Sequence, residues 1–253
     1  MKLFKNSLCF MICFIITATT ILITGATNVQ ASEDPVQLCH ARYHIFSADG
    51  STGHYEGNIA VKNSDPNKKV TVHYCYQYNQ DNWQDVSAKY VETTSDGYEI
   101  WHFETPCNYY SPCIFAVKCE TNGQTYWDNN NGSNYTVTRD VVLAKDSILS
   151  LSSHYEANQT YDRIESINGY IALKNLSSEK SVRVRITEDN WQTYTDIDAD
   201  YHSSQENSNI EYWHYDYKTK TTPKNVQFAV YYEVDGVTYW DNNGGSNYFL
   251  GFR

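Results

Sequence analysis

Basic side chains are scarce in this sequence. Its 253 residues include 19 Lys and Arg against 30 Asp and Glu, which gives a formal net charge of −11 at pH 7. A chain this acidic repels phosphate backbones and anionic lipid, so nucleic acid and membrane surfaces are poor partners. A neutral ligand, held by stacking and hydrogen bonds, would be indifferent to the charge.

Catalytic and metal-binding motifs are absent as well. No Cys-x-x-Cys pair or histidine spacing indicates zinc, so we expect no metal and no cofactor. No Gly-x-Ser-x-Gly motif stands out, and the recurring His102 and His214 are expected to be structural. Glycoside hydrolysis needs two carboxylates about 5–9.5 Å apart across a cleft, and no such pair is evident. We therefore expect a protein that is not an enzyme.

Long apolar runs are confined to the beginning of the chain. Residues 1–31 are predicted to be a signal peptide, with Lys2 and Lys5, an apolar stretch over residues 8–23, and a small-residue cleavage site ending at Ala31. An uncleaved membrane anchor is the alternative, which the Thr-rich apolar run disfavours. The protein is expected to be secreted, with no membrane contact once the leader is removed.

Cysteine is missing from the second half of the chain. Beyond the leader the cysteines are Cys39, Cys75, Cys107, Cys113 and Cys119. In an oxidising compartment Cys107 and Cys113 could close a small loop. Five is an odd number, so at least one thiol is free or pairs between chains, and the pairing stays open.

The sequence contains one unit as two tandem repeats. The motif Tyr-Trp-Asp-Asn-Asn-x-Gly-Ser-Asn-Tyr occupies residues 126–135 and 239–248, each time after Phe-Ala-Val. Val-x-Val, Asp-Asn-Trp and Glu-x-Trp-His also recur, at offsets of 108 to 112 residues. Because the runs are short, alternating and free of helical periodicity, each unit of roughly 105 residues is predicted to be a two-sheet antiparallel sandwich.

Two-residue turns fix the register around the second half of each unit. Asn122-Gly123 and Asp235-Gly236 are typical of hairpins with a type I′ turn. The second turn would set Tyr231 opposite Trp240 and place both outward, away from an apolar face. The first would set Trp127 outward opposite Lys118. An outward indole followed by Asp-Asn-Asn is a flat apolar plate with a polar border, which suits a sugar ring.

These motifs, in this order and repeated, resemble carbohydrate-binding module family 21, whose members include starch-binding domains of glucoamylases and glycogen-targeting subunits of type 1 protein phosphatase. The resemblance implies an all-β chain of two tandem immunoglobulin-like antiparallel β-sandwiches, at residues 36–138 and 147–253. It implies binding of α-1,4-glucans such as starch, glycogen and malto-oligosaccharides. Under this resemblance the binding residues are Trp83, Trp127, Asp128, Asn129, Asn130, Asn134, Trp191, Tyr231, Trp240, Asp241, Asn242, Asn243 and Asn247.

The sequence departs from the family in places. A further aromatic of starch-binding members is replaced by Ala116 and Ala229, and Tyr231 is expected to substitute for it by extending the plate of Trp240. The family's second site lacks its aromatic after Lys-Asn, but Tyr90, Tyr98 and Tyr201 could keep part of it.

Structural alternatives accompany each binding residue. Trp101 and Trp213 lie mid-strand and are expected in the core. The Asn side chains could instead be turn residues that satisfy their own backbone. The favoured function is non-catalytic binding of extracellular α-glucan. The alternative is an accessory or targeting subunit that brings a separate enzyme, a secreted amylase or less readily a phosphatase, to the polysaccharide.

Overall fold

Alternation of apolar and polar side chains dictates strands throughout. The computed structural model describes residues 34–158 and 160–252, so the predicted signal peptide lies outside the described residues. Among the described residues, no helix is long and apolar enough to cross a membrane. In β2, for example, Tyr55, Gly57 and Ile59 are buried while His54, Glu56 and Asn58 between them are partly exposed. That period of two places every second side chain in the core.

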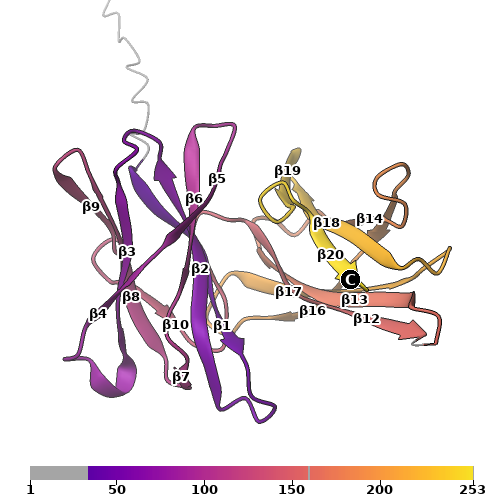
Figure 1. The fold of residues 1–253 in the computed structure, drawn as a ribbon, viewed down its shortest axis with the longest axis horizontal. Coiled ribbons are helices and arrows are strands. Elements are labelled where there is room, and N and C mark those ends of the chain that lie inside the picture. The colour runs from indigo at the N-terminus through magenta and orange to yellow at the C-terminus, as the bar shows by residue number, and fades with distance from the viewer. Residues whose placement is uncertain (1–33, 159, 253) are drawn as a thin grey trace, which may run out of the picture. The chain divides into compact units, whose positions relative to one another are not determined.

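The described residues form twenty strands and one short 3₁₀ helix (Figure 1). In chain order they are β1 (Val36–Ile45), β2 (Thr52–Lys62), β3 (Lys69–Tyr76), η1 (Gln77–Asn79), β4 (Gln84–Ser87), β5 (Lys89–Thr93), β6 (Tyr98–Glu104), β7 (Asn108–Tyr109), β8 (Cys113–Thr121), β9 (Gln124–Asp128), β10 (Tyr135–Val137), β11 (Val142–Leu143), β12 (Ile148–Asn158), β13 (Arg163–Lys174), β14 (Lys180–Thr187), β15 (Thr195–Asp198), β16 (Asp200–Ser204), β17 (Ile210–Lys218), β18 (Asn225–Val234), β19 (Val237–Asp241) and β20 (Tyr248–Gly251).

Four antiparallel sheets result, and they form two pairs. The first pair has the orders β11-β1-β2-β6-β5, with β7 beside β2, and β10-β8-β3-β4, with β9 beside β8. The second pair has the orders β12-β13-β17-β16 and β15-β14-β18-β19, with β20 beside β18. The two pairs therefore share one strand order, and the prediction of two tandem antiparallel sandwiches is confirmed. We call them the first and second modules.

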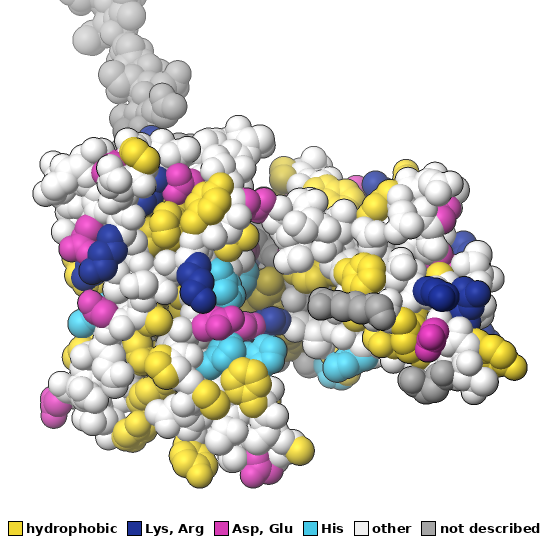
Figure 2. Space-filling view, viewed as in Figure 1, with side chains coloured by type: hydrophobic (Ala, Val, Ile, Leu, Met, Phe, Trp, Pro, Cys, Tyr) yellow, Lys and Arg dark blue, Asp and Glu magenta, His cyan; other side chains and the backbone are white. Residues whose placement is uncertain are grey.

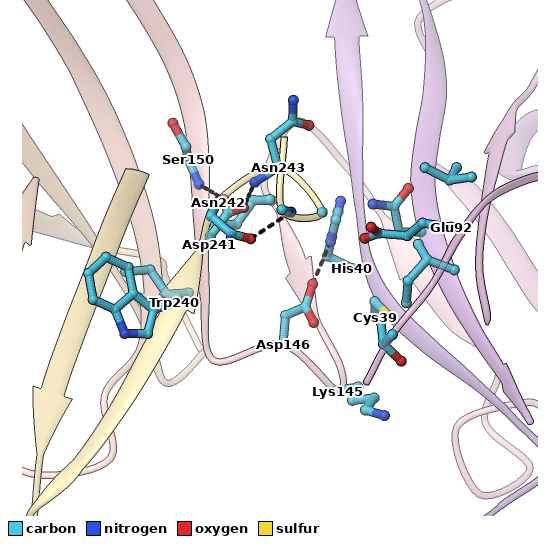
Figure 3. A pocket seen from close by; sticks show the side chains of 18 of the residues that line it. Cys39, His40, Glu92, Lys145, Asp146, Ser150, Trp240, Asp241, Asn242 and Asn243 are labelled. Atoms are coloured by element: carbon cyan, nitrogen blue, oxygen red, sulfur yellow. Dashed lines mark hydrogen bonds and ion pairs between the residues drawn. The ribbon is translucent and has the colours of Figure 1, made fainter. Parts of the chain in front are cut away.

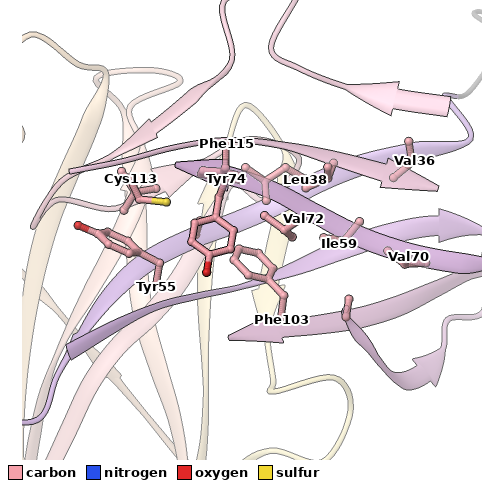
Figure 4. Close-up of a cluster of buried hydrophobic side chains, with 14 of the residues drawn as sticks. Val36, Leu38, Tyr55, Ile59, Val70, Val72, Tyr74, Phe103, Cys113 and Phe115 are labelled. Atoms are coloured by element: carbon pink, nitrogen blue, oxygen red, sulfur yellow. The ribbon is translucent and has the colours of Figure 1, made fainter. Parts of the chain in front are cut away.

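Each module encloses its own hydrophobic core. In the first, Leu38 and Ile59 of one sheet pack with Val72, Tyr74 and Phe115 of the other (Figure 4). The core of the second module repeats this arrangement with Ile171, Val184, Tyr215, Phe228 and Tyr232. Fully burying one such aliphatic or aromatic side chain contributes about 1.5–3 kcal/mol, so these two clusters hold the sheets together.

The hairpin register matches the prediction in both modules. Tyr231 pairs with Trp240 and Tyr232 with Tyr239, while Lys118 pairs with Trp127. Asn122 and Asp235 both have the positive φ that the turn requires, at 50° and 49°. The two-residue turns therefore fix which face each tryptophan occupies.

The cysteines do not form the loop that the sequence allowed. All five described cysteines are free thiols. Cys113 points into the first core (Figure 4), whereas Cys107 is exposed. Burial raises the pKa values of Cys39 and Cys113, so both thiols stay protonated and act as small apolar side chains.

Candidate functional site

The Asp-Asn-Asn loops connect β9 to β10 and β19 to β20 with the same backbone path. Asn130 and Asn134 in the first loop have φ of 51° and 58°, and Asn243 and Asn247 in the second have 51° and 59°. Asparagine tolerates this left-handed region better than most residues. The repeated Asn residues are thus explained first by backbone geometry, as the structural alternative anticipated.

Side chains inside each loop bond to the loop itself. The Asn129 Oδ1 accepts from the Gly132 N–H at 2.9 Å, and the Asn130 Nδ2 donates to the Asn134 carbonyl at 3.1 Å. The second loop repeats both bonds through Asn242 and Asn243, at 2.9 and 3.2 Å. These bonds pre-form the loop, and a sugar would meet it without an ordering cost.

The two loop aspartates are anchors. The Asp241 carboxylate accepts from the Ser150 N–H at 2.7 Å, the Asn243 N–H at 3.1 Å and the Tyr248 hydroxyl at 2.7 Å (Figure 3). Asp128 does the same in the first module, where the donors include the Leu38 N–H at 2.7 Å and the Tyr135 hydroxyl at 2.9 Å. Internal donors thus already engage both carboxylates, which the resemblance had placed among the binding residues. The bonds from Leu38 and Ser150 tie each loop to the first strand of its own module.

Burial and the neighbouring carboxylate also raise the pKa of Tyr135 and of Tyr248. Both phenols therefore remain protonated and keep donating to their aspartates.

The loop tryptophans face outward, as predicted. Trp127 is 48% exposed and Trp240 is 44% exposed. The hairpins explain the exposure of both indoles, because the residues before and after each tryptophan on its strand point to the core or to the edge of the core. The indoles therefore present accessible apolar surface beside the amide-rich loops.

In the first module, three rings form one aromatic surface. The His73 imidazole stacks on Trp83, with centroids 4.8 Å apart and planes at 12°, and lies edge-on to Trp127 at 5.9 Å. Its Nδ1 lies 2.6 Å from Asp85, which also faces the Lys118 ammonium at 3.6 Å. Hydrogen bonding from His73 lowers the pKa of Asp85, so the border of this surface carries a carboxylate at neutral pH.

The second module builds its surface from different residues at matching positions. Arg185 takes the place of His73, and its guanidinium lies 4.2 Å from the Tyr194 ring centroid and 5.2 Å from that of Trp240. Asp196 binds this guanidinium through two hydrogen bonds of 2.7 and 2.8 Å, which lower the pKa of the carboxyl. Arg185 thus lies against both exposed rings and connects them.

Tyr194, and not Trp191, is the counterpart of Trp83. In the first module His73 pairs with Asp85, and Trp83 lies two residues before Asp85. In the second module Arg185 pairs with Asp196, and Tyr194 lies two residues before Asp196. Trp191 has a φ of 67° and donates its indole N–H to Gln227 at 3.0 Å. The Asp-Asn-Trp match in the sequence had aligned the two loops on their tryptophans, but strand register aligns them on the aspartates.

Tyr231 does not extend the plate of Trp240. The two rings stack with centroids 4.5 Å apart, but Tyr231 is only 4% exposed. The Tyr231 ring lies beneath the indole and supports it. It is buried because Trp240 of β19 and Arg185 of β14, the strands on either side of β18, both pack against it. The first module has Lys118 at this position, with its ammonium 5.5 Å from the Trp127 centroid.

The residues expected at a second site separate into two groups. Tyr90 and Tyr201 are exposed, and each lies edge-on to a tryptophan, Trp101 or Trp213, at 5.9 Å. Tyr98 is buried, with the Lys145 ammonium 4.0 Å from its ring centroid. An accessible Tyr–Trp pair therefore survives in each module, without Tyr98.

Trp101 and Trp213 are only partly in the core. Both are half-buried, and each donates its indole N–H to a buried glutamate, Glu99 at 2.9 Å or Glu211 at 3.0 Å. These glutamates in turn pair with buried lysines, at 2.9 Å for Lys68 and 2.7 Å for Lys180. Trp101 and Trp213 were expected in the core. The structure instead places them at its margin, where each packs against an exposed tyrosine.

Hollows border both Asp-Asn-Asn loops. One of about 720 Å³ is lined by Trp127, Asn129 and Asn130, and one of about 850 Å³ by Trp240 and Asn242 (Figure 3). Both lie open to solvent beside an indole and amide groups. The geometry suits a polar, flat-faced molecule that stacks on rings and exchanges hydrogen bonds with amides and carboxylates.

Comparison with known proteins agrees with this geometry. A family model described as "Carbohydrate/starch-binding module (family 21)" matches residues 31–138 and 147–251. The chain belongs to this family. The resemblance expected from the repeated motifs is confirmed, and it applies to both modules.

Known relatives of this family-21 chain include proteins of two kinds. The chain is 38% identical over 88 residues to protein phosphatase 1 regulatory subunit 3B of Danio rerio, a match over 33% of this chain and 30% of that protein. It is 36% identical over 130 residues to glucoamylase 1 of Rhizopus oryzae, over 49% of this chain and 20% of that protein. The matches thus span less than a third of either relative.

A solved structure is also similar to this chain. It is the starch-binding domain of Rhizopus oryzae glucoamylase in complex with beta-cyclodextrin and maltoheptaose. The identity is 28% over 42% of this chain and 94% of that one, with a TM-score of 0.35.

Proposed function

We propose that this chain binds α-1,4-glucans of the starch and glycogen type without cleaving them. The observation that supports this most directly is the pair of exposed aromatic surfaces, Trp83–His73–Trp127 and Tyr194–Arg185–Trp240, each beside an amide-rich loop. Stacked rings and neutral hydrogen-bonding groups recognise the apolar face and the hydroxyls of a sugar. Membership of the family supports the same ligand class.

The proposed location is extracellular, on the strength of the leader-like residues 1–31 alone.

A second candidate function is targeting of a separate enzyme to the polysaccharide. The names of the relatives favour it, because they include protein phosphatase 1 regulatory subunits as well as a glucoamylase. A phosphatase would not dock through Arg183-Val184-Arg185-Ile186, which resembles a short basic-hydrophobic peptide. That segment is paired with β15 on one side and β18 on the other, and Val184 and Ile186 are buried.

The test is retention of the purified chain on insoluble polysaccharides. We expect retention on granular starch and not on cellulose or chitin, with no release of reducing sugar into the supernatant. A variant carrying Trp127→Ala and Trp240→Ala should lose retention while keeping its circular dichroism spectrum. Because the ligand is neutral, affinity for a soluble malto-oligosaccharide should barely change between low and high salt. Sugar release, or equal retention of the double variant, would refute the proposal.

A further inference from the structure

Histidine and acidic side chains gather on the outer face of the first sheet. The strands β1, β2 and β6 run side by side there, and every second residue points away from the core. Figure 2 shows histidine and acidic side chains adjoining one another over these strands. The outward residues are His40, Arg42 and His44 on β1, His54, Glu56 and Asn58 on β2, and His102 and Glu104 on β6.

Strand register brings three of them together. His44 lies directly opposite His54, and Glu56 follows His54 by two residues on the same face. The Glu56 carboxylate lies 3.4 Å from the His44 Nδ1 through one oxygen and 3.1 Å from the His54 Nε2 through the other. One ligand atom from each residue lies within 4.8 Å of the other two. Ligands of a tetrahedral zinc, with bonds of about 2.0–2.1 Å, are about 3.3–3.4 Å apart.

The surroundings favour a metal over a simple hydrogen bond. The side chains of His54 and Glu56 are only 11% and 12% exposed, whereas that of His44 is 45% exposed and leaves an entry path. Phe46 covers the pair, with its ring 4.8 Å from His54 and 5.2 Å from His44. This ring is itself 57% exposed, so it shields one side of the pair and leaves the other side open to an incoming ion.

Arg42 completes the support for the carboxylate. Its Nε donates to the Glu56 Oε1 at 2.7 Å and fixes the orientation of the carboxylate. The other carboxylate oxygen of Glu56, Oε2, faces His54.

We propose that His44, His54 and Glu56 form a binding site for a divalent transition-metal ion of the zinc class. Two imidazoles and one carboxylate are a ligand set that zinc accepts, with water in the fourth position. The site is specific to the first module. In the second, the register positions of His44, His54 and Glu56 hold Glu156, Ser166 and Asn168, none of which is an imidazole.

A neighbouring trio provides the competing assignment. Glu56, His102 and Glu104 also offer ligand atoms within 4.8 Å of one another. His102 lies 2.9 Å from the Asn58 side-chain oxygen through Nδ1 and 3.4 Å from Glu104 through Nε2. We assign the ion to the trio with two histidines because imidazole binds zinc-class ions more selectively than carboxylate does. His102 therefore serves as the matched control.

The test is a zinc titration of the full chain, produced without a histidine tag and with Cys107→Ser to remove the exposed thiol. Zinc competes against a chromogenic chelator, and we expect one ion per chain. His44→Ala and His54→Ala should each weaken zinc binding about 100-fold or more, since even supporting residues cost 10–100-fold. His102→Ala and the second-module variant His154→Ala should stay within about twofold of the parent.

Two outcomes would overturn the assignment. One is the absence of stoichiometric zinc binding by the parent chain. The other is a loss in His102→Ala as large as that in His44→Ala, which would move the ion to the neighbouring trio. If His54→Ala does not fold, the exposed His44 decides the result, with melting of the metal-free variants as the folding control. Cobalt in place of zinc should give the visible absorption of a tetrahedral ion in the parent and lose it in His44→Ala.

Discussion

Tryptophan residues in this chain differ in role according to the face of the sheet they occupy. Trp127 and Trp240 stand on the outer faces beside the amide-rich loops. Trp101 and Trp213 lie half-buried, and each is hydrogen-bonded to a buried glutamate. We propose the first pair as ligand-binding residues, whereas each member of the second pair packs against an exposed tyrosine, Tyr90 or Tyr201.

Replacing Trp240 with alanine should weaken glucan binding about tenfold or more with a small change in melting temperature. A sugar face that covers ~60–80 Å² of indole contributes about 1.5–2 kcal/mol at ~25 cal/mol per Å². Trp213→Ala should instead cost about 2–4 kcal/mol of stability, since it removes packing and leaves Glu211 short of a donor. Calorimetric titration with a malto-oligosaccharide and thermal melts separate the two effects. Equal destabilisation by both changes would contradict the assignment of faces.

Tyr194 provides a sharper test, because the sequence motif and the structure assign its role differently. Tyr194→Ala should weaken binding by the second module, since the ring is exposed beside Arg185 and Trp240. Trp191→Ala should change affinity less than Tyr194→Ala, because its indole is engaged with Gln227. Both variants are compared in a background with Trp83→Ala and Trp127→Ala, so that only the second module binds. The reverse ranking would favour the motif over the strand register.

At the scale of elements, carboxylates connect loops to the sheets through hydrogen bonds. Glu188, just after β14, accepts from the Tyr217 hydroxyl at 2.7 Å and from the Lys220 and Thr221 N–H groups at 2.8 Å each. It thereby connects the end of a strand in one sheet to the loop after β17 in the other. Burial opposes ionisation of Glu188, but these donors outweigh it and lower its pKa below the ordinary value of 4.5.

Acid should therefore destabilise the second module by protonating the Glu188 carboxylate. A carboxyl whose pKa is lower in the folded state contributes stability above its unfolded pKa of 4.5, and that contribution is lost as the pH falls below 4.5. We expect Glu188→Gln to be less stable than the parent at pH 7. The difference should shrink progressively as the pH drops from 4.5. Urea unfolding at several pH values measures it, and a constant difference would show that the bonds of Glu188 do not depend on its charge.

Elements with strong local signals were predictable from sequence. The Asn-Gly and Asp-Gly turns fixed the pairing of Tyr231 with Trp240 and of Lys118 with Trp127, because type I′ turns permit one register. The burial of Tyr231 was not predictable, since it depends on Arg185 and Trp240 from neighbouring strands.

The histidine cluster was missed for a related reason. His54 and Glu56 are two residues apart on β2, but His44 lies ten and twelve residues before them and joins them only through the pairing of β1 with β2. That pairing includes a bulge between Leu38 and His40, which shifts the outward face and cannot be read from alternation alone. His73 and Arg185 were not predictable either, because each is a single polar residue after a Val-x-Val motif and meets its aromatic neighbours only in the folded sheet.

At the scale of the whole chain, two modules of one family carry two proposed glucan surfaces. A single site of two rings and a few hydrogen bonds is expected to bind with a Kd in the millimolar to tens-of-micromolar range. This corresponds to a net binding free energy of about −4 to −6 kcal/mol after the cost of association. Two linked sites on one polymer gain from a high effective concentration, and apparent affinity could rise ~10²-fold.

Disabling one site should therefore matter far more on a polymer than on a short sugar. We expect the full chain with Trp83→Ala and Trp127→Ala to lose most of its retention on starch granules. Its second site should bind a short malto-oligosaccharide with unchanged affinity. Depletion from solution by granules and calorimetric titration provide the two readouts. Granule retention equal to that of the parent would mean that the first module has another role.

The shared strand order has a consequence for biogenesis. β8 and β18 have equivalent partners in their own sheets, so either could pair with the wrong module while both are unfolded. During synthesis the first module is complete at Leu143, and the remaining 110 of the 253 residues take a further ~5–22 s at about 5–20 residues per second. That interval lets one module fold before its competitor exists. Refolding from denaturant removes the interval, so we expect a slowly refolding fraction whose size does not depend on protein concentration.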